Sequence, residues 1–201
     1  MLHAAGFIAA LGVGAAFVTA ASGQRIPATI FAASVVVMLG TSTLYHLITW
    51  SGPHRLWMRR ADHAGIYLLI AGTYTPVGLL ALHGYWQKLV LGFVWGGALA
   101  GTLVKLCWVD APKWLSVVLG IALGWVGVAA LPKLAQSTGA WAVSLLLAGG
   151  VAYTVGGIVY AKRRPNPRPG FFGYHEVFHA LTLVALAFQY VAIAFFVVRV
   201  G

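Results

Sequence analysis

Long apolar stretches alternate along the chain with short segments rich in glycine, proline and basic residues. A membrane-spanning helix needs about 20 consecutive apolar residues, because the hydrocarbon core of a bilayer is about 30 Å thick. Seven stretches meet this requirement, and breaks such as Ser51-Gly52-Pro53 separate them. The pattern therefore predicts an all-α, seven-transmembrane helix bundle forming a single domain over residues 1–201, with spans at about 3–22, 28–50, 61–82, 86–108, 113–131, 139–161 and 174–198.

The composition also indicates an integral membrane protein. Hydrophobic residues make up 61% of the 201 residues and charged residues only 8%, whereas about 25% of the residues in soluble domains are charged. The single cysteine, Cys107, excludes an intrachain disulfide and a cysteine-based zinc site. No lysine or arginine precedes the first apolar stretch, so we interpret it as a retained span and not as a signal peptide.

The net charge of +10 is better explained by membrane topology than by nucleic-acid binding, because the basic residues lie in short loops between spans. Cytoplasmic loops carry an excess of lysine and arginine. We therefore expect a multi-pass protein of the plasma (cytoplasmic) membrane with its N-terminus in the cytoplasm and its C-terminus outside. Lys105, just inside the fourth span, is expected to snorkel toward water. The basic residues on the cytoplasmic side would be Arg55, Arg59, Arg60, Lys105, Lys113, Lys162, Arg163, Arg164 and Arg168, and those on the outer side would be Arg25, Lys88, Lys133 and Arg199.

Two histidines, His175 and His179, open the last span. Residues four apart lie on one face of a helix, about one turn from each other, so the two imidazoles form a pair of metal donors for which zinc is the usual ion. His46 lies about one turn before the end of the second span, at the same cytoplasmic face. We take His46 as the third zinc ligand.

Two further polar residues share this depth. Asp62 opens the third span, and Ser42 lies one turn deeper than His46 on the same helix face. Three histidines leave the fourth tetrahedral position of zinc open, which is typical of catalytic sites. Asp62 would then orient a water molecule and shuttle its proton, while Ser42 would hydrogen-bond that water or a substrate carbonyl. The alternatives are that the cluster only caps helix ends, and that Ser42 bonds its own helix backbone.

The stretch from His175 to His179 also matches the H-E-x-x-H pattern of soluble zinc peptidases, in which the glutamate is the general base. Glu176 is equally suited to cap the start of a helix, where negative charge is favoured. We favour Asp62 over Glu176 as the working acid. Of the remaining histidines, His63 adjoins Asp62 but points about 100° away around the helix, so we interpret it as a rim residue. We interpret His3, His54 and His83 as exposed residues.

Four motifs occur in the order and spacing of a known family. Together they resemble the hemolysin III family, which belongs with the progestin and adipoQ receptors and more distantly with the alkaline ceramidases. The resemblance covers nearly the whole chain. It implies seven helices, an inward N-terminus, zinc on the three histidines and a water-holding carboxylate at Asp62. The motifs are Ser42-x-x-x-His46, Asp62-His63-Ala64-Gly65-Ile66-Tyr67, Ala71-Gly72-Thr73-Tyr74-Thr75-Pro76 and His175-x-x-x-His179.

The opening residues 2–6 resemble the end of a longer N-terminus in that family, whose usual acidic start is missing here. We expect either absent upstream residues or a start codon assigned too late.

The resemblance implies several functions. Receptors of the family are regarded as lipid amide hydrolases, and its bacterial members are linked to cytolysis or to membrane homeostasis. Our leading hypothesis is a zinc-dependent integral-membrane hydrolase that acts on a membrane lipid amide or ester. The alternatives are a zinc-containing sensor or regulator of membrane homeostasis without turnover, and a hemolysin-like cytolytic protein. The cytolytic role is weakest physically, because a pore needs polar groups across the whole bilayer and here they gather at one end. The sequence indicates neither the substrate nor the oligomeric state.

Overall fold

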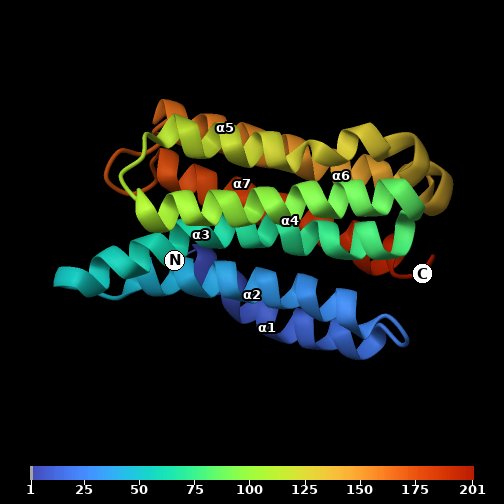
Figure 1. Ribbon diagram of the computed structural model, residues 1–201. Helices are drawn as coiled ribbons and strands as arrows, with labels where there is room; N and C mark the ends of the chain where they lie inside the picture. Colours follow the sequence, from blue (N-terminus) through green and yellow to red (C-terminus); the bar gives the residue numbers. More distant parts are fainter. Residues whose placement is uncertain (1) are drawn as a thin grey trace.

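The computed structural model describes residues 2–201 and consists of helices joined by short turns. Figure 1 shows the helices running roughly parallel or antiparallel to one another, so that the turns collect at two opposite ends. This arrangement follows from the apolar sequence, because a helix satisfies its own backbone hydrogen bonds where no water is present. The α-helices are α1 (Leu2–Ala20), α2 (Arg25–Leu47), α3 (Gly52–Pro76), α4 (Gly84–Cys107), α5 (Lys113–Gly124), α6 (Leu131–Lys162) and α7 (Tyr174–Ala192).

Six helical stretches are long and apolar enough to cross a membrane, which confirms an all-helical polytopic membrane protein. One of them, Lys113–Lys162, covers 50 residues and includes both α5 and α6, more than twice the length that one crossing needs. It folds back on itself, so that Gly157 of α6 lies against Val117 of α5. A Cβ atom added to Gly157 would be 3.1 Å from the Val117 side chain. Figure 1 shows α5 and α6 side by side.

The break inside this 50-residue stretch differs from the prediction. The sequence places a connection at residues 132–138, but α5 ends at Gly124, a 3₁₀ turn covers Val126–Ala130, and helix resumes at Leu131. The reversal falls at Gly139, whose φ of 83° is accessible mainly to glycine. Pro132 did not prevent the helix, because proline is tolerated in a first helical turn.

The boundaries of α2 and α3 also move. The basic segment 54–60 was predicted as a loop, but it forms the first two turns of α3, which begins at Gly52. Pro53 sits in the first turn, where its missing N–H breaks no helical bond, and the arginines that follow are good helix formers. The second helix ends at Leu47 and not at residue 50.

The helix becomes irregular at Pro76, where a π-helical turn begins. The α-helical pattern of α3 ends at Pro76 and continues as a π turn over Val77–Ala81. Proline lacks an N–H and crowds the preceding turn, so it disturbs the ladder around it. A second π turn, Ile193–Val197, extends α7.

α3 is held against its neighbours through glycine. A Cβ atom added to Gly72 of α3 would overlap the side chain of Ser34 on α2. Likewise, a Cβ on Gly101 of α4 would lie 2.7 Å from the ring of Tyr67 on α3. Small residues let membrane helices approach closely, and packing then replaces the hydrophobic effect as the attractive force. α3 is therefore fixed on two sides.

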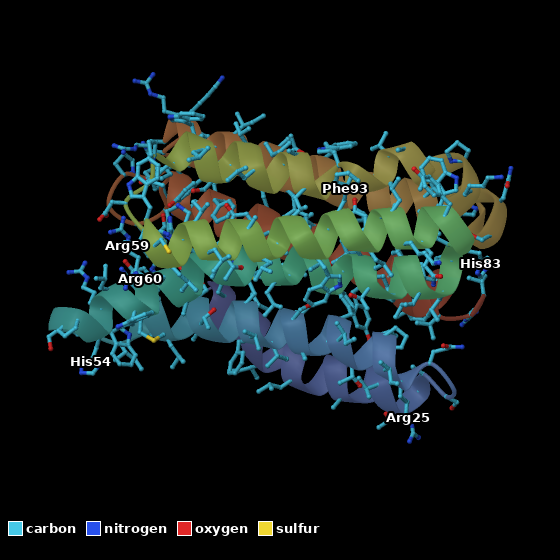
Figure 2. The ribbon with its side chains drawn as sticks, in the orientation of Figure 1. Arg25, His54, Arg59, Arg60, His83 and Phe93 are labelled. Carbon is cyan, nitrogen blue, oxygen red and sulfur yellow. The ribbon has the colours of Figure 1, made fainter. Side chains whose placement is uncertain are left out.

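Most of the basic residues gather at one end of the bundle. Arg59 on α3 donates a 2.7 Å hydrogen bond to Asp110 in the turn before α5, and Lys113 at the start of α5 lies 3.1 Å from the Tyr174 hydroxyl at the start of α7. These contacts bring the starts of three helices to the same end. Figure 2 shows Arg59 and Arg60 there, with His83 and Arg25 at the opposite end.

We expect Gly72→Ala to lower the free energy of unfolding by about 1–3 kcal/mol, the usual cost of overpacking a core. The control is Gly92→Ala on α4, because an added Cβ there meets nothing within 4 Å. Thermal unfolding of the two detergent-solubilised variants measures the difference. Equal melting temperatures would contradict the close approach of α2 and α3.

Candidate metal centre

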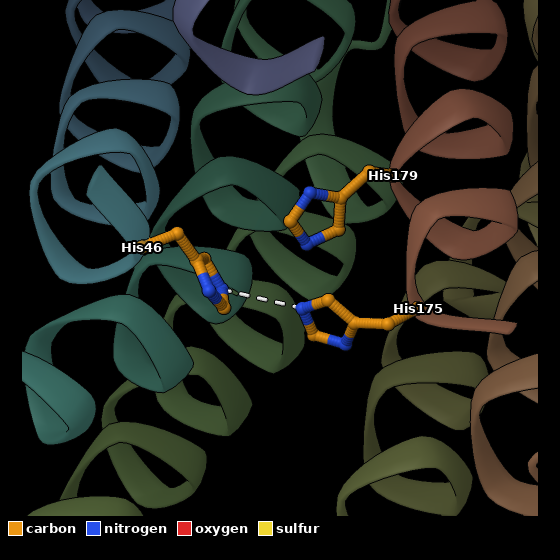
Figure 3. A group of neighbouring side chains, drawn as sticks. All are labelled: His46, His175 and His179. Carbon is orange, nitrogen blue, oxygen red and sulfur yellow. Dashed lines mark hydrogen bonds between the residues drawn. The ribbon is translucent and has the colours of Figure 1, made fainter. Parts of the chain in front are cut away.

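The three predicted ligands lie together at the basic end of the bundle. One ring nitrogen each from His46, His175 and His179 can be chosen so that all three atoms lie within 4.8 Å of one another. Figure 3 shows His46 reaching across from α2 toward the two histidines that α7 presents one turn apart. His46 and His175 are 129 residues apart in the sequence, and the fold brings their side chains together.

The distance between His46 and His175 fits a tetrahedral zinc site. Imidazole nitrogens lie about 2.0–2.1 Å from zinc, so two of them at the tetrahedral angle are about 3.3–3.4 Å apart. The Nε2 atoms of His46 and His175 are 3.3 Å apart. The donor set is three imidazoles without a thiolate, which suits zinc. That these residues bind zinc stays a prediction, and the structure gives it a compatible geometry.

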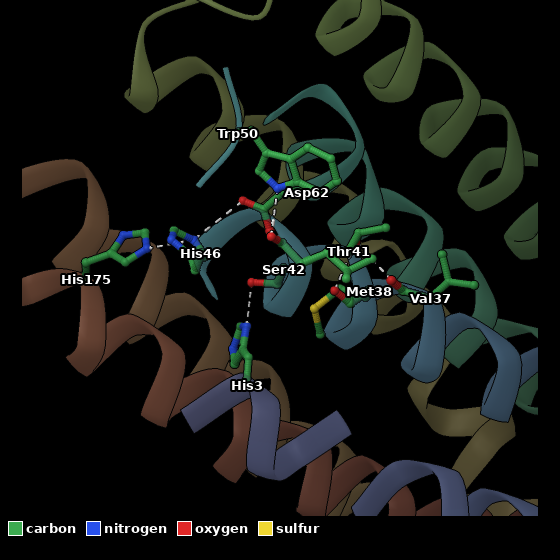
Figure 4. A network of polar contacts seen from close by, with 10 residues as sticks. His3, Val37, Met38, Thr41, Ser42, His46, Trp50, Asp62 and His175 are labelled. Carbon is green, nitrogen blue, oxygen red and sulfur yellow. Dashed lines mark hydrogen bonds and ion pairs between the residues drawn. The ribbon is translucent and has the colours of Figure 1, made fainter. Parts of the chain in front are cut away.

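Asp62 stands beside the histidines. Its Oδ2 atom lies 3.8 Å from Nε2 of His46, and its side chain is only 14% exposed. Asp62 is too far for a direct hydrogen bond to His46, but it is close enough to hold a water molecule between the two side chains. In Figure 4, Asp62 approaches from α3 on the side of His46 opposite to His175. The carboxylate predicted as the working acid is therefore next to the predicted ligands.

His3 was predicted to be exposed, and this prediction was wrong. Its side chain is 5% exposed. Its ring stacks on that of His179 with centroids 3.7 Å apart and planes within 6°, and its Nδ1 atom lies 2.8 Å from Oγ of Ser42 (Figure 4). The reason is that α1 begins at Leu2, so His3 already lies inside the bundle. The same depth argument that selected His46 would have selected His3.

Ser42 is buried and bonded to another helix. Its side chain is 2% exposed, and the hydroxyl meets His3 on α1. The alternative of a bond to its own helix backbone is thus not what the structure records, in contrast to Thr41, which bonds the carbonyls of Val37 and Met38. Ser42 joins α1 to the residues around Asp62.

Glu176 caps the start of α7. Its Oε2 atom accepts a 2.8 Å hydrogen bond from the Gly173 N–H, which completes a capping box. This is the alternative use that the sequence left open for the H-E-x-x-H match. The carboxylate faces the helix start, whereas Asp62 faces the histidines.

The remaining histidines stay apart from the cluster. His54 and His83 are exposed, as predicted. His63 is half-buried, and its Nδ1 atom is buried without a hydrogen-bond partner among the described residues. His63 is not one of the three residues whose ring nitrogens converge.

A cavity opens beside the cluster. Its volume is about 200 Å³. Ser42, Asp62 and His179 line one end, and Trp125 and Gln189 line it deeper between the helices. Most of its wall is apolar, as in sites that hold small organic ligands. The sequence did not indicate this cavity, because its walls come from all seven α-helices, which no short-range pattern relates.

Comparison with known proteins identifies the family. A family model described as "Haemolysin-III related" matches residues 1–190. The chain belongs to the hemolysin III family. Its relatives include the Hemolysin-3 homolog of Bacillus subtilis (strain 168), 34% identical over 86% of this chain and 78% of that protein, and Hemolysin-3 of Bacillus cereus, 32% identical over 84% and 74%. The Heptahelical transmembrane protein ADIPOR2 of Oryza sativa subsp. japonica is 29% identical over 84% and 81%. In this hemolysin III protein, the resemblance inferred from the motifs is therefore confirmed.

Removing the His3 side chain should destabilise the protein. We expect His3→Ala to lower the free energy of unfolding by about 1–3 kcal/mol, because the Ser42 hydroxyl loses its partner in a buried position. His83→Ala, at an exposed histidine, serves as the control and should leave the melting temperature unchanged. If both variants melt like the wild type in detergent, His3 is not buried against Ser42 and His179.

Proposed function

We propose that this protein is a zinc-dependent integral-membrane hydrolase that cleaves a lipid amide or ester with an activated water. The observation that carries the proposal is the convergence of three imidazole nitrogens within 4.8 Å of one another, with Asp62 3.8 Å from one of them and a mostly apolar cavity opening at the same point. A donor set, an acid and room for a lipid chain are the parts that such a reaction needs.

We further propose seven membrane crossings with the N-terminus in the cytoplasm, and location in the plasma membrane. Two crossings within Lys113–Lys162 are supported by its 50-residue length and by the contact of Gly157 with Val117. The rice relative is named heptahelical. The basic end of the bundle, which holds Arg59 and Arg60 (Figure 2), would face the cytoplasm by the positive-inside rule.

Each residue of the site would have a distinct role in the reaction. His46, His175 and His179 would hold zinc, which when bound supplies a Lewis acid that polarises a carbonyl and favours ionisation of water. Asp62 would take a proton from the attacking water and return it to the leaving group. Ser42, fixed by His3 at 2.8 Å, would hold the substrate carbonyl or the water in place. His175 and His179 are half-buried, whereas His46 is exposed.

Zinc content tests the ligand assignment directly. We expect the purified protein to contain about one zinc ion per chain and His179→Ala to contain far less, because a three-ligand site does not survive the loss of one ligand. His63→Ala is the matched control, since His63 lies close to the site but outside the converging set. Elemental analysis measures all three proteins. Wild type without zinc, or zinc lost equally in His63→Ala, would contradict the assignment.

The acid can be identified by turnover. We expect Asp62→Asn to lower hydrolysis of a ceramide or phospholipid substrate by about 10²–10⁴-fold, the usual contribution of a general acid–base group. Glu176→Gln should reduce turnover much less, because Glu176 caps α7. The assignment would be overturned if Glu176→Gln abolished turnover while zinc stayed bound and Asp62→Asn remained active.

Two other functions are separated by the same assay. The name Hemolysin-3 of the Bacillus cereus relative favours a cytolytic role, and a zinc-containing sensor of membrane state would use the same histidines without turnover. Hydrolysis that a chelator abolishes supports the enzyme. Zinc binding without hydrolysis across a broad lipid panel supports the sensor, and leakage of a dye from vesicles on addition of the protein supports the cytolysin.

A further inference from the structure

A second group of charged side chains lines the same cavity. Arg59 on α3, Lys105 on α4 and Lys113 on α5 all belong to the cavity wall, and Asp62 is the only carboxylate among the described residues that line it. This group, which we call the cation wall, consists of Arg59, Lys105 and Lys113. The wall carries more positive than negative charge, although burying charge is costly without a partner.

Lys105 is the member of the cation wall that lacks a partner. It was predicted to snorkel to water; the residue as a whole is 3% exposed, but its Nζ atom is not one of the fully buried polar atoms without a partner. The nearby acid, Asp110, is itself 72% exposed and is bound by Arg59 at 2.7 Å. No hydrogen bond or ion pair of Lys105 is recorded within residues 2–201. Lys105 therefore lines a mostly apolar cavity without an ion pair, and an anion that enters the cavity would supply a partner for its charge.

The neighbouring groups are arranged to receive such an anion. The buried Nδ1 atom of His63, another residue of the cavity wall, has no partner among the described residues. Lys113 keeps its ammonium 4.4 Å from the ring of Tyr160 and 3.1 Å from the Tyr174 hydroxyl, which holds its position without neutralising its charge. The cation wall is thus preorganised and remains positively charged.

The geometry points to an oxyanion subsite at the cation wall, formed by Lys105 with Arg59 and Lys113, that takes the phosphate or carboxylate of an amphiphile whose chains fill the apolar part of the cavity. Arg59 and Asp62 are three residues apart on α3 and therefore about 5–6 Å apart at their Cβ atoms. The two side chains therefore lie on the same face of α3, so a lipid with its anion at the cation wall would extend past Asp62.

The subsite rests on the proposed function in one respect only, which is the orientation assigned to the lipid in the cavity. Its binding test needs neither zinc nor turnover, so the two proposals can fail separately. The probes are dioleoyl phosphatidic acid, oleate and dioleoylglycerol, offered to the detergent-solubilised full chain with and without a chelator. They share similar acyl chains and differ in the anion, and native mass spectrometry or a fluorescence titration gives the affinities.

We expect phosphatidic acid or oleate to bind more tightly than dioleoylglycerol. We expect Lys105→Met to lower the affinity for the anionic probe by about 10- to 100-fold, which corresponds to the loss of a hydrogen bond to a charged group. Methionine replaces the buried charge by an apolar chain of similar length, so the fold should persist, which thermal unfolding checks. Lys88→Met, at the exposed opposite end of the same helix, should bind like the wild type.

The two anionic probes identify the source of the anion. A loss confined to phosphatidic acid assigns a phosphate headgroup, and a loss confined to oleate assigns the carboxylate of a fatty acid. Arg59→Gln is a second, independent variant, and it should weaken the same probe as Lys105→Met because it also frees Asp110 to neutralise the wall. Unchanged anion binding in Lys105→Met and Arg59→Gln, or an equal loss in Lys88→Met, overturns the subsite.

Discussion

The structure depends on the high cost of leaving a polar group without a partner inside a bilayer. The backbone meets this constraint by being helical almost throughout, and the side chains meet it by gathering at one end. His3 bonds Ser42, Asp62 lies beside His46, and Arg59 binds Asp110. The first two contacts join different helices, and the third joins α3 to the turn before α5. The same pairs that satisfy polar atoms therefore also hold this end of the bundle together.

The position of Asp62 is a consequence of packing. α3 lies against α2 and α4 through Gly72 and Gly101, at which no side chain fits. Helices in contact at glycine have little freedom to slide, because a shift of one residue brings a larger side chain into the gap. The carboxylate two to three turns before Gly72 is thereby set at a fixed height relative to His46 on α2.

The sequence predicts the parts of this molecule that repeat or that obey a local rule. The helical spans follow from hydropathy, and His175 and His179 follow from the helical period. The depth of His46 and Asp62 follows from counting spans. Local rules missed what depends on tertiary contacts, namely the burial of His3 and the helical basic segment 54–60. An arginine-rich segment resembles a loop by hydropathy, but arginine is also a good helix former, and α3 uses that property to extend past the apolar region.

The same contrast explains the H-E-x-x-H match in α7. In a soluble peptidase the two histidines and the glutamate act within one site, whereas here Glu176 bonds the Gly173 N–H and the acid beside the histidines comes from α3. The third histidine comes from α2, which packs against α1 and α3, while α7 packs against α6 and α1. α1 is thus the common neighbour of the two helices that present the three histidines. His3, which stacks on His179 and bonds Ser42, connects those two helices at the level of the cluster, so the spacing of His46 from α7 depends on the first turn of the chain.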